Sequence, residues 1–219
     1  MADLTRRQQM DARRERILET ARGLIESRGY EGLTMRDLAG SSGVTVPTVY
    51  NLVGSKEEVL FAAVKEQTRR FVADLQRARG DLIAVVDATV SQLLRRPRYY
   101  RALVLVLLGA EPADPSRRHV AGAVAREIAI ALDGLFEAGD LAPWVDLAAL
   151  GERLHAHLDM TSIEWARGGL SAAALRAAAR FEAATTMLGV TSGASRTACE
   201  KIARKSQGDA RRRRRRVAA

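Results

Sequence analysis

Residues 34–56 form the stretch of this chain that most restricts its fold. It reads Thr-Met-Arg-Asp-Leu-Ala-Gly-Ser-Ser-Gly-Val-Thr-Val-Pro-Thr-Val-Tyr-Asn-Leu-Val-Gly-Ser-Lys. Apolar residues recur at helical spacing on both sides of Gly43, and glycine permits a sharp turn without steric cost. Thr34 and Thr45 precede the two apolar groups, where a threonine can cap a helix. The segment therefore predicts a helix-turn-helix, whose second helix enters the major groove of DNA.

The rest of the chain also has the pattern of helices, and no strand pattern is present. Prolines are few, and Ala, Leu, Arg and Glu are abundant, so we expect an all-α fold. Residues 1–55 are predicted to form a three-helix helix-turn-helix domain, in which the first helix spans 13–28 and residues 1–10 are mobile. Residues 56–190 are predicted to form a second helical domain. Its expected helices are 56–78, 82–95, 98–108, 117–137, 144–167 and 171–189.

Most of the positive charge is concentrated at the C-terminus. The whole chain has a formal charge of +9, and residues 191–219 contain ten basic and two acidic residues, which leaves about +1 for residues 1–190. Six consecutive arginines occupy 211–216, and their mutual repulsion opposes a compact structure. We therefore expect residues 191–219 to be a disordered basic tail that can bind acidic partners, including DNA.

Several classes of protein lack support in this sequence. The single cysteine, Cys199, excludes an intrachain disulfide and a cysteine-rich zinc site. No secretory signal is visible, and the longest apolar run, 102–108, is far shorter than a membrane-spanning helix, so we expect a soluble cytoplasmic protein. Phosphate-binding glycine loops, nucleophile elbows and paired-histidine zinc motifs are absent, so we expect no enzyme, no cofactor and no metal.

Residues 17–56 resemble the TetR family of bacterial transcriptional regulators. The matching features are the leading helix that ends at Arg28-Gly29-Tyr30, then Thr34, Leu38-Ala39, Gly43-Val44, Thr48-Val49-Tyr50 and Gly54-Ser55-Lys56. Leu52 and Val53 depart from the family, which often has His or Tyr and then Phe at these positions, although both keep an apolar character. The resemblance implies a homodimer formed by the last two helices of 144–189. It also implies a ligand pocket among the helices before them.

The candidate DNA-contacting residues lie in or beside the predicted helix-turn-helix. They are Thr34, Arg36, Thr45, Val46, Pro47, Thr48, Tyr50, Asn51 and Lys56. The Thr48 and Tyr50 hydroxyls and the Lys56 ammonium suit phosphate contacts, as do the N–H groups of the helix that follows Thr34, and the resemblance implies the same roles. Asn51 suits an adenine edge, Arg36 a guanine, and Val46 and Pro47 suit thymine methyl groups. The equally weighted alternative is that Val46 and Pro47 only begin the helix.

The candidate ligand-binding residues are Tyr99, Tyr100, Trp144, His155 and Asp159. Residues 80–165 are rich in Leu, Val and Ala, which favours a hydrophobic or aromatic small molecule. For each residue the competing interpretation, that it fills the core, carries more weight. His155 and Asp159 share a helix face while His157 points away. A His–Asp hydrogen bond, or polar groups at the pocket or the dimer interface, is favoured over metal ligation.

The favoured hypothesis is a homodimeric, sequence-specific repressor that a small-molecule effector releases from a palindromic double-stranded operator. In a dimer, the two helix-turn-helix domains would stand about 34–36 Å apart to reach successive major grooves. One alternative is a non-specific DNA-associating protein driven by the arginine-rich tail. A second alternative is a repressor that has lost ligand control.

Overall fold

The computed structural model describes residues 2–109 and 115–217, with side chains described for 6–63, 71–106 and 122–207. Within these ranges the chain is helical, and the sole β-type pairing is one isolated bridge between Leu141 and Thr191. This confirms the predicted all-α fold. The helices are α1 (Ala2–Arg28), α2 (Met35–Ser42), α3 (Val46–Leu52), α4 (Lys56–Arg77), α5 (Leu82–Arg95), α6 (Pro97–Gly109), α7 (Pro115–Glu137), α8 (Leu147–Ala166), α9 (Ala172–Leu188) and α10 (Gly193–Val217).

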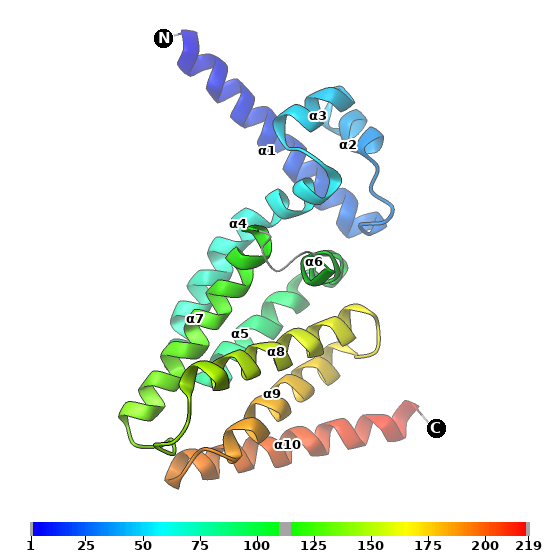
Figure 1. Ribbon diagram of the computed structural model, residues 1–219. Helices are drawn as coiled ribbons and strands as arrows, with labels where there is room; N and C mark the ends of the chain where they lie inside the picture. Colours follow the sequence, from blue (N-terminus) through cyan, green and yellow to red (C-terminus); the bar gives the residue numbers. More distant parts are fainter. Residues whose placement is uncertain (1, 110–114, 218–219) are drawn as a thin grey trace.

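The helices form a small head and a larger helical domain, with α4 leading from one to the other (Figure 1). The head consists of α1, α2 and α3 and lies at the end opposite α10. In the larger domain α5 packs against α4, α7 and α9, and α8 packs against α6, α7 and α9. Helix α10 lies along α9.

The head has its own apolar core, built from one stripe of each helix. Ile17, Ala21 and Ile25 recur at helical spacing on α1 and are fully buried. They meet a second group of buried side chains, namely Leu38 and Ala39 of α2, Val49 of α3 and Val59, Leu60 and Ala63 of α4. Because the start of α4 shares this core, the head is packed directly onto the helix that leads to the rest of the chain.

Helix α1 is longer than the sequence pattern predicted. It begins at Ala2, so the expected start at residue 13 and the expected mobile segment 1–10 are wrong for residues 2–10. Residues 6–13 are exposed, and no glycine or proline interrupts the chain before Gly23. Apolar periodicity detects only the part of a helix that packs, which here begins at Ile17.

The C-terminal segment also differs from the prediction. Residues 193–217 form α10, so the expected disorder of 191–219 is wrong over that helix. Ala203 and Ser206 are buried and Cys199 is half-buried, which places one stripe of small residues against α9. The start is also anchored, because the Ser192 N–H donates to the Asp140 carbonyl at 3.0 Å and the Ser195 hydroxyl donates to the Asp140 carboxylate at 2.7 Å. Composition alone missed the helix because small residues produce a weak apolar signal.

Candidate nucleic-acid interface

The start of α2 and the turn after it have the predicted geometry. The Thr34 hydroxyl accepts a hydrogen bond from the Asp37 N–H at 3.0 Å, so Thr34 caps α2. Gly43 has φ +66°, a left-handed conformation that favours glycine, and it ends the helix. Leu38 and Ala39 then hold α2 against the core of the head.

The start of α3 differs from the prediction in one detail. Thr45 precedes the helix, but its hydroxyl does not accept a hydrogen bond from the backbone of α3. It lies 2.8 Å from the Thr48 hydroxyl instead. Pro47 occupies the first turn, where its missing N–H costs nothing. The two hydroxyls therefore form a paired polar group at the N-terminal end of α3.

Helix α3 presents one side to solvent. Val49 is fully buried, whereas Tyr50 is 53% exposed and Thr45, Pro47 and Asn51 are also exposed. Val46 and Thr48 are half-buried, and Val46 packs partly against the core. Six of the predicted contact residues are thus brought together on one short helix and its cap. Thr34 and Arg36 of the neighbouring α2 region are exposed as well.

Lys56 is held beside the helix-turn-helix by its neighbours. Its Nζ lies 4.4 Å from the centre of the Tyr30 ring, a cation–π contact. The Ser55 hydroxyl and the Glu58 side chain form a capping box that fixes the first turn of α4. Partial burial, together with the nearby Glu57 carboxylate, raises the pKa of Tyr30 to about 12, so this phenol stays neutral beneath the ammonium group at physiological pH.

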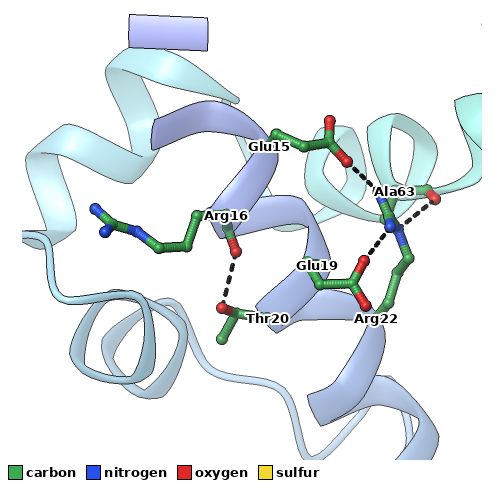
Figure 2. Close-up of polar contacts among 6 residues, drawn as sticks. All are labelled: Glu15, Arg16, Glu19, Thr20, Arg22 and Ala63. Atoms are coloured by element: carbon green, nitrogen blue, oxygen red, sulfur yellow. Dashed lines mark hydrogen bonds and ion pairs between the residues drawn. The ribbon is translucent and has the colours of Figure 1, made fainter. Parts of the chain in front are cut away.

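Arginines of α1 connect the head internally, and the sequence pattern did not identify them. Arg14 Nε donates to the Leu52 carbonyl at 3.2 Å, which anchors the end of α3. Arg22 Nε donates to the Ala63 carbonyl of α4 at 3.2 Å, and the same guanidinium pairs with Glu15 and Glu19 (Figure 2). No periodicity or motif marks the bonds to Leu52 and Ala63, because each joins positions about 40 residues apart in the chain.

Helix α1 adds a further set of cations near the head. Arg6, Arg7, Arg13 and Arg16 are all exposed. The N-terminal part of α1 projects beyond the body on the side where α2 and α3 lie (Figure 1). Such cations are suited to contacts with DNA phosphates on either side of α3.

The five predicted ligand-binding residues do not form one site. Tyr99 and Tyr100 are buried on α6, with ring centres 5.6 Å apart, and the Tyr99 hydroxyl donates to the Leu60 carbonyl of α4 at 2.7 Å. Trp144 is 74% exposed in the turn between α7 and α8, which lies away from α6 (Figure 1). Trp144 is therefore separated from the two tyrosines.

The histidines of α8 lie where their spacing predicted. His155 Nε2 is 3.9 Å from the Asp159 carboxylate on the same helix face, which is too long for the predicted hydrogen bond between them. His157 points to α9, with Nδ1 3.7 Å from the Glu182 carboxylate and 3.5 Å from the Thr186 hydroxyl. Among the side chains that the structure describes, no three His, Cys, Asp or Glu residues gather as metal ligands would.

Comparison with known proteins identifies the head. The family model for bacterial regulatory proteins of the tetR family matches residues 17–63. The HTH-type transcriptional repressor KstR2 of Mycobacterium tuberculosis is 33% identical over 87 residues, which span 40% of this chain and 40% of that repressor. Residues 17–63 therefore form a domain of the tetR family of bacterial regulatory proteins.

Solved structures extend the likeness to most of the fold of this chain. SmeT, the repressor of the Stenotrophomonas maltophilia multidrug efflux pump SmeDEF, aligns with a TM-score of 0.63 at 18% identity, covering 83% of this chain and 92% of SmeT. Thermus thermophilus FadR, a transcriptional repressor solved with lauroyl-CoA, aligns with a TM-score of 0.62 at 21% identity, covering 80% and 94%. Identities this low describe the fold alone. Across the described helices, none is both long and apolar enough to cross a membrane.

Proposed function

We propose that the chain is a homodimeric transcriptional repressor that reads a palindromic DNA site through α3 and leaves it when a small apolar effector binds. The observation that carries the proposal is the outward presentation of α3. Val49 anchors the helix in the core of the head, while Pro47, Tyr50 and Asn51 remain free to contact a duplex. Direct base contacts fall to Asn51, Val46 and Pro47 of α3 and to Arg36 of α2, and phosphate contacts fall to Thr34, Thr48, Tyr50 and Lys56.

The outer face of α8 and α9 supports a dimer. Met160 is 63% exposed there, although it is a large apolar side chain. A groove runs between the two helices beside it, lined by His157, Ile163, Glu164, Arg167 and Glu182. Helix α10 packs along α9, and none of its described residues lines this groove. A second copy that covers this face would bury Met160 and set the distance between two heads.

Control by an effector is supported by the contacts of α6. This helix reaches the head region at two places, through the Tyr99 hydroxyl on the Leu60 carbonyl and through Arg98 Nη1, which is 2.9 Å from the Ser27 carbonyl at the end of α1. A ligand packed against α6 therefore has a direct route to α1 and α4. It shifts the position of the heads only if it binds the DNA-competent and released forms with different affinity.

In vitro selection from a random duplex library tests the proposal. The full chain should enrich a two-fold symmetric sequence with half-sites about 10 base pairs apart, since each head reads one major groove. Light scattering of the complex should show an even number of subunits per duplex. Enrichment of no sequence, or a monomer on the duplex, would refute the proposal.

A truncation distinguishes the proposed repressor from the rival function, which is non-specific DNA association through the six consecutive arginines. Removing residues 208–219 deletes the six arginines but leaves the described contact between α9 and α10. A repressor keeps its preference for the selected duplex over random duplex. A non-specific binder loses most of its affinity for both.

A further inference from the structure

Two side chains inside the helical domain bury oxygen atoms that have no hydrogen-bond partner. Gln92 of α5 is 6% exposed and Glu127 of α7 is 7% exposed. In the described part of the chain, neither Gln92 Oε1 nor Glu127 Oε2 is paired. Gln92 is otherwise engaged, because its Nε2 donates to the Tyr100 hydroxyl of α6. Buried polar atoms are nearly always paired in native proteins, so two free acceptors in one domain require an explanation.

Gln92 faces away from α9. Asp87 marks the opposite side of α5, since its carboxylate accepts a hydrogen bond from Arg180 Nε of α9 at 2.6 Å. Gln92 follows Asp87 by five residues, which turns it well over a right angle around the helix. Val85 and Thr89 are buried on the same side of α5 as Gln92. Helix α5 packs against α4, α6 and α7 as well as α9, so this stripe faces those three helices.

Glu127 faces the same interior from α7. Ile128 and Leu132, on one edge of the buried face of α7, lie against Gly151 of α8. Glu127 is on the other edge of that buried face, about 100° around the helix from Ile128. Helix α7 packs against α4 and α5 in addition to α8, so this edge faces α4 and α5. Both free acceptors therefore face the interior of the domain, where α4, α5, α6 and α7 pack on one another.

The surroundings of these acceptors are apolar. Buried side chains of these helices include Val85 on the Gln92 side of α5, Leu103 and Val104 of α6, and Val124, one turn before Glu127 on α7. A carboxylate among such side chains lacks the water that stabilises its charge, and the described residues provide no cation in its place. A ligand with an apolar body and a positively charged N–H donor would supply what is missing to both oxygen atoms. An anionic ligand would meet the carboxylate with like charge.

We propose that the effector is an apolar molecule with a protonated amine, whose N–H groups bond Glu127 Oε2 and Gln92 Oε1. This inference rests on the proposed effector site and names its chemical class. The amide-to-phenol bond links Gln92 of α5 to Tyr100 of α6, the helix that contacts α1 and α4. Amine binding at this point thus acts on the helix that reaches the head.

Three probes with the same body separate the headgroups: 4-phenylbutylamine, 4-phenyl-1-butanol and 4-phenylbutyrate. Isothermal titration of the full chain should show the amine binding about tenfold or more tightly than the alcohol, because a hydrogen bond to a charged group exceeds a neutral one, and the acid weakest. Glu127→Gln should remove this preference while leaving the alcohol unchanged. Glu137→Gln, an exposed position on the same helix, is the matched control and should behave as wild type.

Thermal unfolding shows whether a variant loses amine binding because it has lost stability. Glu127→Gln replaces a carboxyl group whose Oε2 has no partner among the described residues with a neutral amide, so its melting temperature should equal or exceed that of wild type. Gln92→Leu provides an independent variant that should weaken amine binding less than Glu127→Gln does. Equal binding of the acid and the amine, an unchanged preference in Glu127→Gln, or no binding of any probe overturns the inference. Selection of a palindromic duplex reports on the proposed DNA function separately, so either can fail without the other.

Discussion

The head and the α9–α10 pair are both helical, but their structures are specified in different ways. In the head, each helix start or turn has a local signal: Thr34 caps α2, Gly43 turns the chain, and Ser55 with Glu58 caps α4. In the α9–α10 pair, the Ser171 hydroxyl caps α9 by accepting from the Ala174 N–H at 3.2 Å, and close packing of small side chains joins the two helices. Ala177, Ala179, Ala183 and Ala184 are buried on α9, and Ala203 and Ser206 on α10.

This difference follows from what each region has to do in the proposed function. A DNA groove has nearly constant dimensions, so a head that reads it needs one fixed geometry, which local signals can encode. An effector or a dimer surface has no such fixed template. Its structure then depends on packing between distant segments. Accordingly, the family model covers residues 17–63, while the likeness beyond them is mainly one of fold.

A charge placed in the core of the head gives the largest expected effect and tests whether the head and the α9–α10 pair are specified separately. Val49→Asp buries an unpaired carboxylate at a fully buried position, with an expected cost of roughly 3 kcal/mol or more. Binding to the selected duplex should be lost, and circular dichroism should show that most helix remains. The control Asn51→Asp is exposed on the same helix and should weaken DNA binding with a stability change within about 0.5 kcal/mol. Loss of all helix in Val49→Asp would show that the two regions do not fold independently.

Replacing a small residue with a larger one tests the packing between α9 and α10. Ala203→Leu overpacks a position that is 6% exposed and should cost roughly 1–3 kcal/mol in thermal or denaturant unfolding. Ala198→Leu makes the same change at an exposed position of α10 and should be nearly neutral. Affinity for the selected duplex should stay the same in both. A loss of affinity with Ala203→Leu alone would mean that α10 influences the head.

The fold was largely predictable because most of its helices have apolar stripes and clear stops. Helices α4 to α9 begin and end within three residues of their predicted bounds. The predictions failed at both ends of the chain, where α1 is solvated over its first turns and α10 packs through small residues. Neither situation produces the apolar periodicity from which helices are recognised.

The candidate site was predictable only where it is local in sequence. The exposed side of α3 follows from its helical spacing, and Tyr50 and Asn51 lie there as expected. The contacts of Arg14 with Leu52, Arg22 with Ala63 and Tyr99 with Leu60 join segments about 40 residues apart. Gln92 and Glu127 were missed for the same reason, since burial without a partner is a property of the packed chain.

Removing single threonine hydroxyls tests the local signals of the head and has a smaller expected effect. Thr34→Ala removes the hydroxyl that caps α2 and should cost about 1 kcal/mol. Thr45→Ala makes the same substitution before α3, where the hydroxyl bonds Thr48 and caps no backbone N–H, so its cost should be smaller. Chemical denaturation compares the two. Equal costs would mean that the cap of α2 contributes no more than the side-chain pair on α3.

The smallest expected change in stability comes from removing single cations at opposite ends of the molecule. Lys56→Ala should leave stability within about 0.5 kcal/mol but reduce the slope of log affinity against log salt by about one, because one phosphate contact is lost. Lys201→Ala removes an exposed cation from α10, at the end opposite the head, and should leave the slope unchanged. Affinity for the selected duplex measured over a series of salt concentrations gives both slopes. If Lys201→Ala lowered the slope as much as Lys56→Ala, α10 would be part of the DNA-binding surface, and DNA binding could no longer be assigned to the head alone.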